Sequence, residues 1–141
     1  MSAIRLIACA IAAVVMCACG DNAETPTSAT TTTAEPITIL FSGTLQPLGT
    51  RFYSYTMTSA GSVSAMLASL ERGSAPMNNS LELGLGIPAG TGCATSVASN
   101  TNTSLIPQLR QDFDKGTYCV RISDKDGLPA AMTFTIRLVH P

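Results

Sequence analysis

From residue 37 onward, apolar and polar residues alternate with a period of two in several short runs. Such alternation is typical of half-buried antiparallel β-strands, because successive side chains of a strand point to opposite faces of the sheet. The apolar positions of the five clearest runs are Ile37, Ile39 and Phe41; Tyr53, Tyr55 and Met57; Val63, Ala65 and Leu67; Leu81, Leu83, Leu85 and Ile87; and Phe134, Ile136 and Leu138. We expect Pro88 to end the Leu-rich run, and residues 116–123 to form a further strand.

Glycines lie between these runs or at their ends, often beside Pro, Asn or Asp, as tight turns require. Only residues 62–73 also fit a helical period. We expect a strand there, because Ser and Val are indifferent helix formers and glycines bound the segment. Seven or eight short strands in about 105 residues predict an all-β fold, an antiparallel β-sandwich over residues 37–141.

The first eighteen residues follow a different pattern. One positive charge, Arg5, precedes an uncharged apolar run over residues 6–18. As a helix this run would be about 20 Å long, which is shorter than the roughly 30 Å hydrocarbon core of a bilayer. We therefore expect a secretory signal peptide over residues 1–18 rather than a transmembrane anchor or a buried helix.

The sequence Met-Cys-Ala-Cys at residues 16–19 resembles the lipobox of bacterial lipoproteins. Ala18 is the small residue expected before the cleavage site, and Cys19 would receive diacylglycerol, although Met16 stands where such proteins usually have Leu. Cys17 is the alternative, but it would place the bulky Met16 next to the cut. The resemblance implies an anchor of two or three acyl chains. Because Gly20 rather than Asp follows, it also implies the outer membrane of a two-membraned bacterium.

Residues 19–36 are expected to form a lipidated, Thr-rich linker. Residues 21–36 contain six threonines and two prolines but no large apolar side chain. Such a segment cannot bury enough surface to offset the entropy lost on ordering. The predicted organisation is therefore a signal peptide, a tether and one sandwich domain.

Cleavage before Cys19 would leave Cys93 and Cys119 as the two remaining thiols in an oxidising compartment, which favours a disulfide between them. Cys119 alternates with Val120 and Ile122, so it is expected on the polar face of its strand. Cys93 lies in a stretch rich in Gly, Ala and Ser that predicts a loop. The bond would then hold this loop across the outer face of the sheet. The alternatives are two cysteines that never meet, or that pair with other chains.

Several motifs of the domain follow a recognisable order. Residues 41–67 combine a strand that ends in Gly, an alternating aromatic strand, an Ala-Gly turn and a strand of small residues. A Leu-rich strand (81–87) and a Gly-Thr-Tyr strand within residues 113–138 follow. This order resembles the bacterial pre-peptidase C-terminal (PPC) domain. The resemblance implies a secreted, jelly-roll-like sandwich that is accessory to an enzyme, although here the domain follows a linker rather than a peptidase.

The net charge and the catalytic motifs of the sequence bear on which classes of function to expect. The net charge of −1 provides no basic field for nucleic acid. The single histidine, His140, lies next to the C-terminus, where a strand end is expected to fray. No nucleophile motif or metal-protease motif occurs in the sequence. We therefore expect neither an enzyme nor a cofactor.

Four aspartates are candidates for a calcium site, since calcium prefers oxygen ligands. Asp112 and Asp114 precede the strand at residues 116–123, and Asp124 and Asp126 follow it. The sequence Asp-Lys-Asp-Gly lacks the downstream bidentate Glu of an EF-hand, and Asp-Gly is also common in turns. We expect solvated turns and no metal, with the two pairs at opposite ends of the strand.

The predicted function is that of a membrane-anchored envelope lipoprotein whose sandwich is a non-catalytic binding module for a protein or a glycan. Phe52 and Phe113 are the candidates for an exposed aromatic contact, since the chain has no Trp. The alternative is a structural or accessory lipoprotein that supports a larger envelope, secretion or peptidase assembly.

Overall fold

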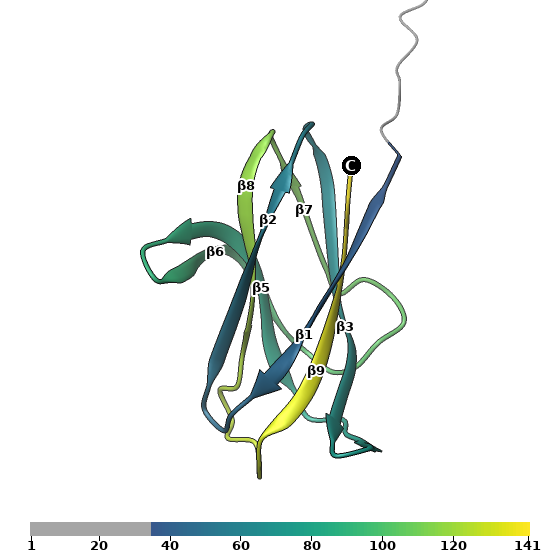
Figure 1. Cartoon of the computed structure of the whole chain (residues 1–141), viewed down its shortest axis with the longest axis vertical. Coiled ribbons are helices and arrows are strands. Elements are labelled where there is room, and N and C mark those ends of the chain that lie inside the picture. Colours follow the sequence, from purple (N-terminus) through teal and green to yellow (C-terminus); the bar gives the residue numbers. More distant parts are fainter. Residues whose placement is uncertain (1–34) are drawn as a thin grey trace, which may run out of the picture. The chain divides into compact units, whose positions relative to one another are not determined.

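The computed structural model describes residues 35–141, which fold into two antiparallel β-sheets (Figure 1). The strands in this part of the chain are β1 (Ile37–Leu45), β2 (Thr50–Met57), β3 (Gly61–Arg72), β4 (Ala75–Pro76), β5 (Leu81–Ala89), β6 (Gly92–Thr101), β7 (Leu109–Phe113), β8 (Gly116–Ser123) and β9 (Met132–His140). One sheet has the order β1-β9-β3-β4, with β7 also paired to β3, and the other has the order β2-β8-β5-β6. The predicted antiparallel β-sandwich is confirmed, with one strand more than expected.

The predicted signal peptide, Cys19 and all but the last two residues of the predicted linker lie outside the described residues. Within residues 35–141, no helix is long and apolar enough to cross a membrane.

The core lies between the two sheets and is built from the alternating apolar positions. The side chains that are no more than 1% exposed include Val63, Ala65, Leu67, Leu81, Leu83, Leu85, Val120, Ile122, Phe134, Ile136 and Leu138. Residues 62–73 belong to β3 apart from the turn glycine, so the choice of strand over helix is confirmed. Each sheet therefore buries one face against the other, as the period of two predicts.

Two positions that the alternation placed inward are instead exposed. Ile37 is 47% exposed at the start of β1, the edge strand of its sheet, and Ile87 is 58% exposed. Ile87 follows a register shift between Leu85 and Gly86, where β5 leaves β8 and remains paired only with β6. Pro88 does not end the strand, because β5 has no neighbour on its other side at this point and its missing N–H is tolerated.

Strands β6 and β7 were not predicted, and the expected loop around Cys93 is part of β6. Both strands lie at the edge of their sheets. An edge strand with both faces partly solvated needs no regular row of large apolar side chains, so β6 is composed mainly of Ala, Ser, Thr and Asn.

Candidate functional site

The disulfide between Cys93 and Cys119 is confirmed, with their Cα atoms 5.9 Å apart. The two residues lie on β6 and β8, which are separated in the sheet by β5. Figure 1 shows the β5–β6 hairpin turning away from the direction of the other strands. The disulfide therefore holds the bent hairpin, rather than a loop, against the outer face of β8, and this cover leaves Cys119 fully buried.

Two glycines of β5 allow β6 to approach so closely. A Cβ atom on Gly86 would lie 1.9 Å from the carbonyl oxygen of Ala94, and one on Gly84 would lie 2.5 Å from the Thr95 side chain. Neither position has room for a larger residue unless β6 moves. The Leu-Gly-Leu-Gly sequence of β5 thus places leucines in the core and leaves the outer face free for β6.

Asp124, one of the calcium candidates, is instead bonded to the backbone. It is 4% exposed, and its Oδ2 atom accepts hydrogen bonds from the amides of Leu48 and Leu128, each at 2.6 Å. Its Oδ1 atom accepts one from the Gly127 amide at 3.0 Å. Burial acts to raise the pKa of this carboxyl, but the hydrogen bonds from the backbone outweigh it, so the pKa is lowered from its usual value. Asp124 thereby joins the β1–β2 turn to the segment that follows β8.

The other three aspartates are exposed. Asp126 lies in the same turn as Asp124, whereas Asp112 and Asp114 lie at the opposite end of β8. Within residues 35–141, no three His, Cys, Asp or Glu side chains are grouped so that they could hold a metal ion.

His140 does not fray, contrary to the sequence-based expectation. It is 3% exposed and pairs with Ile37, because β9 is a central strand between β1 and β3. Its ring lies 5.7 Å from the ring of Tyr55, and its Nδ1 atom lies 2.7 Å from the carbonyl oxygen of Pro141. Burial, with a smaller contribution from Tyr118, raises the pKa of Tyr55 well above its usual value.

The two predicted aromatic contact residues differ in exposure. Phe52 is 38% exposed on β2. Phe113 is half-buried against the core, and its ring centroid lies 4.2 Å from that of Tyr118. Only Phe52 therefore remains available for an external contact.

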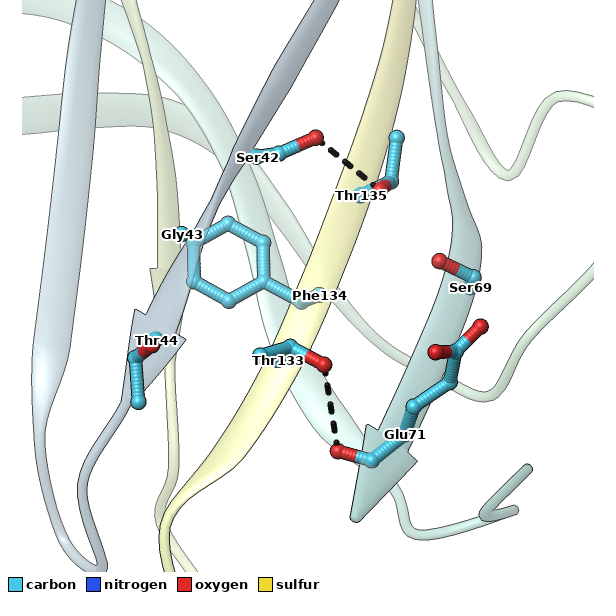
Figure 2. Close-up of a pocket in the computed structure, with 8 residues that line it drawn as sticks. All are labelled: Ser42, Gly43, Thr44, Ser69, Glu71, Thr133, Phe134 and Thr135. Carbon is cyan, nitrogen blue, oxygen red and sulfur yellow. Dashed lines mark hydrogen bonds between the residues drawn. The ribbon is translucent and has the colours of Figure 1, made fainter. Parts of the chain in front are cut away.

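A shallow depression of about 360 Å³ lies on the outer face of the β1-β9-β3 sheet (Figure 2). Its polar lining consists of Ser42 and Thr44 from β1, Thr133 and Thr135 from β9, and Ser69 and Glu71 from β3. These residues form two rows across the sheet, because Thr135 pairs with Ser42 and Ser69 while Thr133 pairs with Thr44 and Glu71. The Ser42 and Thr135 hydroxyls are 3.0 Å apart, within hydrogen-bonding distance. The depression thus combines five hydroxyl groups with one carboxylate.

A second feature, which sequence reasoning missed, is the segment 102–108 between β6 and β7. We call it the 102–108 loop. Its Leu105 and Ile106 side chains are 91% and 71% exposed, the highest values among the large exposed apolar residues described, with Ile106 equalled by Leu48. The available signal was a pair of large aliphatic residues within a polar run of Asn, Thr and Ser that shows no alternation.

Hydrogen bonds to β3 hold the 102–108 loop in place. The Ser104 amide donates to the Leu67 carbonyl at 2.9 Å, and the Gln108 amide donates to the Ala65 carbonyl at 3.0 Å. The Gln108 side chain accepts from the Leu67 amide at 2.9 Å and donates to the Asn102 carbonyl. The loop is therefore attached at both ends, while its two aliphatic side chains point into solvent.

Comparison with known proteins gives no function for any of these surfaces. No protein-family model matches the chain, and no curated protein matches it either. The resemblance to the PPC domain and to lipoproteins therefore stays a prediction.

Proposed function

We propose that this protein is a lipid-anchored envelope lipoprotein whose β-sandwich is a non-catalytic binding module for another protein. The observation that supports a protein partner is the 102–108 loop, which presents Leu105 and Ile106 to solvent on a fixed backbone. Loops held by a rigid sheet are common binding sites. The proposed contact consists of these two aliphatic side chains with a surround of uncharged polar residues.

The 102–108 loop is suited to binding because its backbone is already ordered before a partner binds. Burying one large aliphatic side chain contributes roughly 1.5–3 kcal/mol. A mobile loop would lose part of this gain, because it loses conformational entropy when it binds. A loop bonded to Ala65 and Leu67 is already ordered in the folded protein and loses little more. Two such side chains can therefore act as the centre of a small protein–protein contact.

The test is capture of partners from detergent-solubilised envelope by the full chain, with and without the double substitution Leu105→Lys and Ile106→Lys. We expect a stoichiometric partner to be captured by the wild type and lost from the double variant. Leu40→Lys is the control, because it alters an exposed leucine on another surface. The alternative function, support of a larger envelope, secretion or peptidase assembly, predicts a complex that survives the double substitution, and that result would contradict the loop as the contact.

The proposed anchor is the lipid on Cys19, followed by a linker with a root-mean-square reach of roughly 20–25 Å. Cys19→Ala should leave an unprocessed and unlipidated precursor, which is measured by gel mobility and by labelling with a fatty-acid analogue. Cys17→Ala, two residues away, is the control and should be processed normally. Normal processing of the Cys19 variant would overturn the assignment.

A glycan is the second candidate ligand, and the depression in Figure 2 favours it. Hydroxyl groups and a carboxylate on three adjacent strands can donate and accept hydrogen bonds with the hydroxyls of a sugar. Titration of soluble oligosaccharides followed by NMR should shift the resonances of Ser69 and Thr133, and Glu71→Gln should weaken the effect. Asp112→Asn is the matched control, and an equal loss with both variants would contradict this site.

A further inference from the structure

We propose that the free edge of β1 pairs with β1 of a second copy of the chain, antiparallel, through residues 37–41. This inference goes beyond the proposed function, because it concerns a different surface and a different partner. The pairing would extend the β1-β9-β3 sheet of one copy into the same sheet of the other.

The orientation of the β1 backbone shows which groups are free. The hydroxyl of Tyr53 donates to the Ser42 carbonyl at 3.0 Å, and Nε of Arg51 donates to the Thr44 carbonyl at 3.2 Å. These two carbonyls therefore point away from β9, toward the open edge. In an antiparallel strand the N–H and C=O of one residue point the same way and alternate from residue to residue. The backbone groups of Thr38 and Leu40 thus also face the open edge, where no further strand of the described chain pairs with β1.

The composition of this segment favours pairing. Residues 37–41 read Ile-Thr-Ile-Leu-Phe. Ile, Thr and Phe are good strand formers, and none of the five residues carries a charge. Leu40 is 62% exposed and Ile37 is 47% exposed. Edge strands that avoid association usually carry a lysine, an interior proline or a bulge. Residues 37–41 have none of these, and their pairing with β9 is regular throughout.

Charge complementarity selects a second copy as the occupant. The register that uses only the free groups pairs Thr38 with Leu40 of the second copy, and Leu40 with its Thr38, so that a two-fold axis passes at Ile39. Glu35 of each copy then approaches the end of the other β1, where Arg51 is bonded to Thr44. Both charged side chains are exposed, and no like charges face each other along β1 itself.

The second half of β1, around Ser42 and Thr44, limits how many copies of the chain can associate. The side chains of Arg51 and Tyr53 already occupy the edge at Thr44 and Ser42, so a second strand is expected to pair only with the first half. A contact that uses the same segment on both copies closes with two-fold symmetry. We therefore expect a dimer and not a fibre.

Sedimentation velocity of the full chain in mild detergent tests the dimer. Leu40→Lys should weaken it about tenfold or more, because the new charge lies within the pairing segment of both copies. Leu105→Lys, the same change on the 102–108 loop, should leave it unchanged. Glu35→Arg and Arg51→Glu should each weaken the dimer, whereas the double variant should recover it. A wild-type chain that stays monomeric into the millimolar range, or a double variant that is no better than either single one, would overturn the proposal.

Cross-linking tests the register. The proposed axis brings the two copies of residue 39 to a Cα separation of about 4.5 Å, which a disulfide can bridge. The two copies of residue 37 would lie about 13 Å apart along the strands. In the full chain with its native cysteines, and with the wild type as the background, oxidation should cross-link Ile39→Cys but not Ile37→Cys. Equal cross-linking of both variants, or none of the first, would overturn the pairing.

Discussion

Replacing Asp124 with Asn should destabilise the sandwich by about 2–4 kcal/mol at neutral pH, although Asn has the same shape. The carboxylate accepts three backbone hydrogen bonds, two at Oδ2 from Leu48 and Leu128 and one at Oδ1 from Gly127. Asn retains one oxygen, so its amide nitrogen must face at least one backbone N–H donor. If the oxygen keeps the Oδ2 position, only the Gly127 amide loses its partner. If it takes the Oδ1 position, the Leu48 and Leu128 amides both lose theirs, and an unpaired buried donor such as the Leu128 amide costs about 1–3 kcal/mol. The Leu48 amide lies in an exposed turn, where water can replace part of the lost bond.

The predicted loss should also depend on pH, because the pKa of Asp124 is lower in the folded state than its usual value. A carboxyl whose folded pKa is depressed contributes stability that is fully present above its unfolded pKa of about 3.9. This contribution is lost as the pH falls from there through the folded pKa. The difference in unfolding free energy between wild type and Asp124→Asn should therefore be constant near neutral pH and shrink in acid.

The assay is urea unfolding of residues 35–141 followed by circular dichroism, at several pH values between about 7 and 2. Asp126→Asn is the matched control, since its exposed carboxyl lies in the same turn and the change removes the same charge. We expect the control to change the free energy of unfolding by no more than a few tenths of a kcal/mol. A midpoint for Asp124→Asn equal to that of wild type at pH 7, or a difference that persists undiminished in acid, would refute the reasoning.

Three further predictions concern the disulfide, a glycine of β5 and the β1–β2 turn. Changing Cys93 and Cys119 together to Ser should cost about 2–4 kcal/mol in urea unfolding while the strand content seen by circular dichroism is retained; an unchanged midpoint would contradict this. Gly86→Ala should lower the melting temperature strongly, because its Cβ would lie 1.9 Å from the Ala94 carbonyl oxygen, and a stable variant would mean that β6 can move away freely. Leu48→Gly should raise stability by up to about 1 kcal/mol, since Leu48 has φ 56° and is 71% exposed; a loss would show that its side chain packs usefully.

The sequence was sufficient to predict the strands that supply the core. Runs such as Leu81, Leu83 and Leu85 alternate because one face of a sandwich sheet is buried, and this physical cause acts locally. The same reasoning could not find β6, whose residues are small and polar because β6 lies at an edge. It also failed at Ile87, where the chain keeps its alternation beyond the point at which β5 leaves β8.

Features that depend on distant contacts were predicted less well. The pairing of Cys93 with Cys119 followed from counting cysteines, but the element that holds Cys93 depends on the bend of β5 and β6. Asp124 was considered as a turn residue or a metal ligand, whereas its main role involves Leu48, 76 residues away in the sequence. The exposure of Leu105 likewise depends on hydrogen bonds between the 102–108 loop and β3, and no local sequence pattern predicts these bonds.

The three surfaces discussed above can be altered one at a time, because the residue that is changed in each lies on a different element. Leu40 projects from β1, Glu71 from the outer face of β3, and Leu105 from the 102–108 loop. The loop is attached through backbone groups of β3 at Ala65 and Leu67, so a side-chain change at Glu71 leaves its hydrogen bonds in place. Loss of the dimer through Leu40→Lys should therefore leave partner capture intact, and loss of capture through the loop variants should leave the dimer intact. If the two properties were lost together in both variants, the β1 edge and the loop would have to belong to one continuous interface.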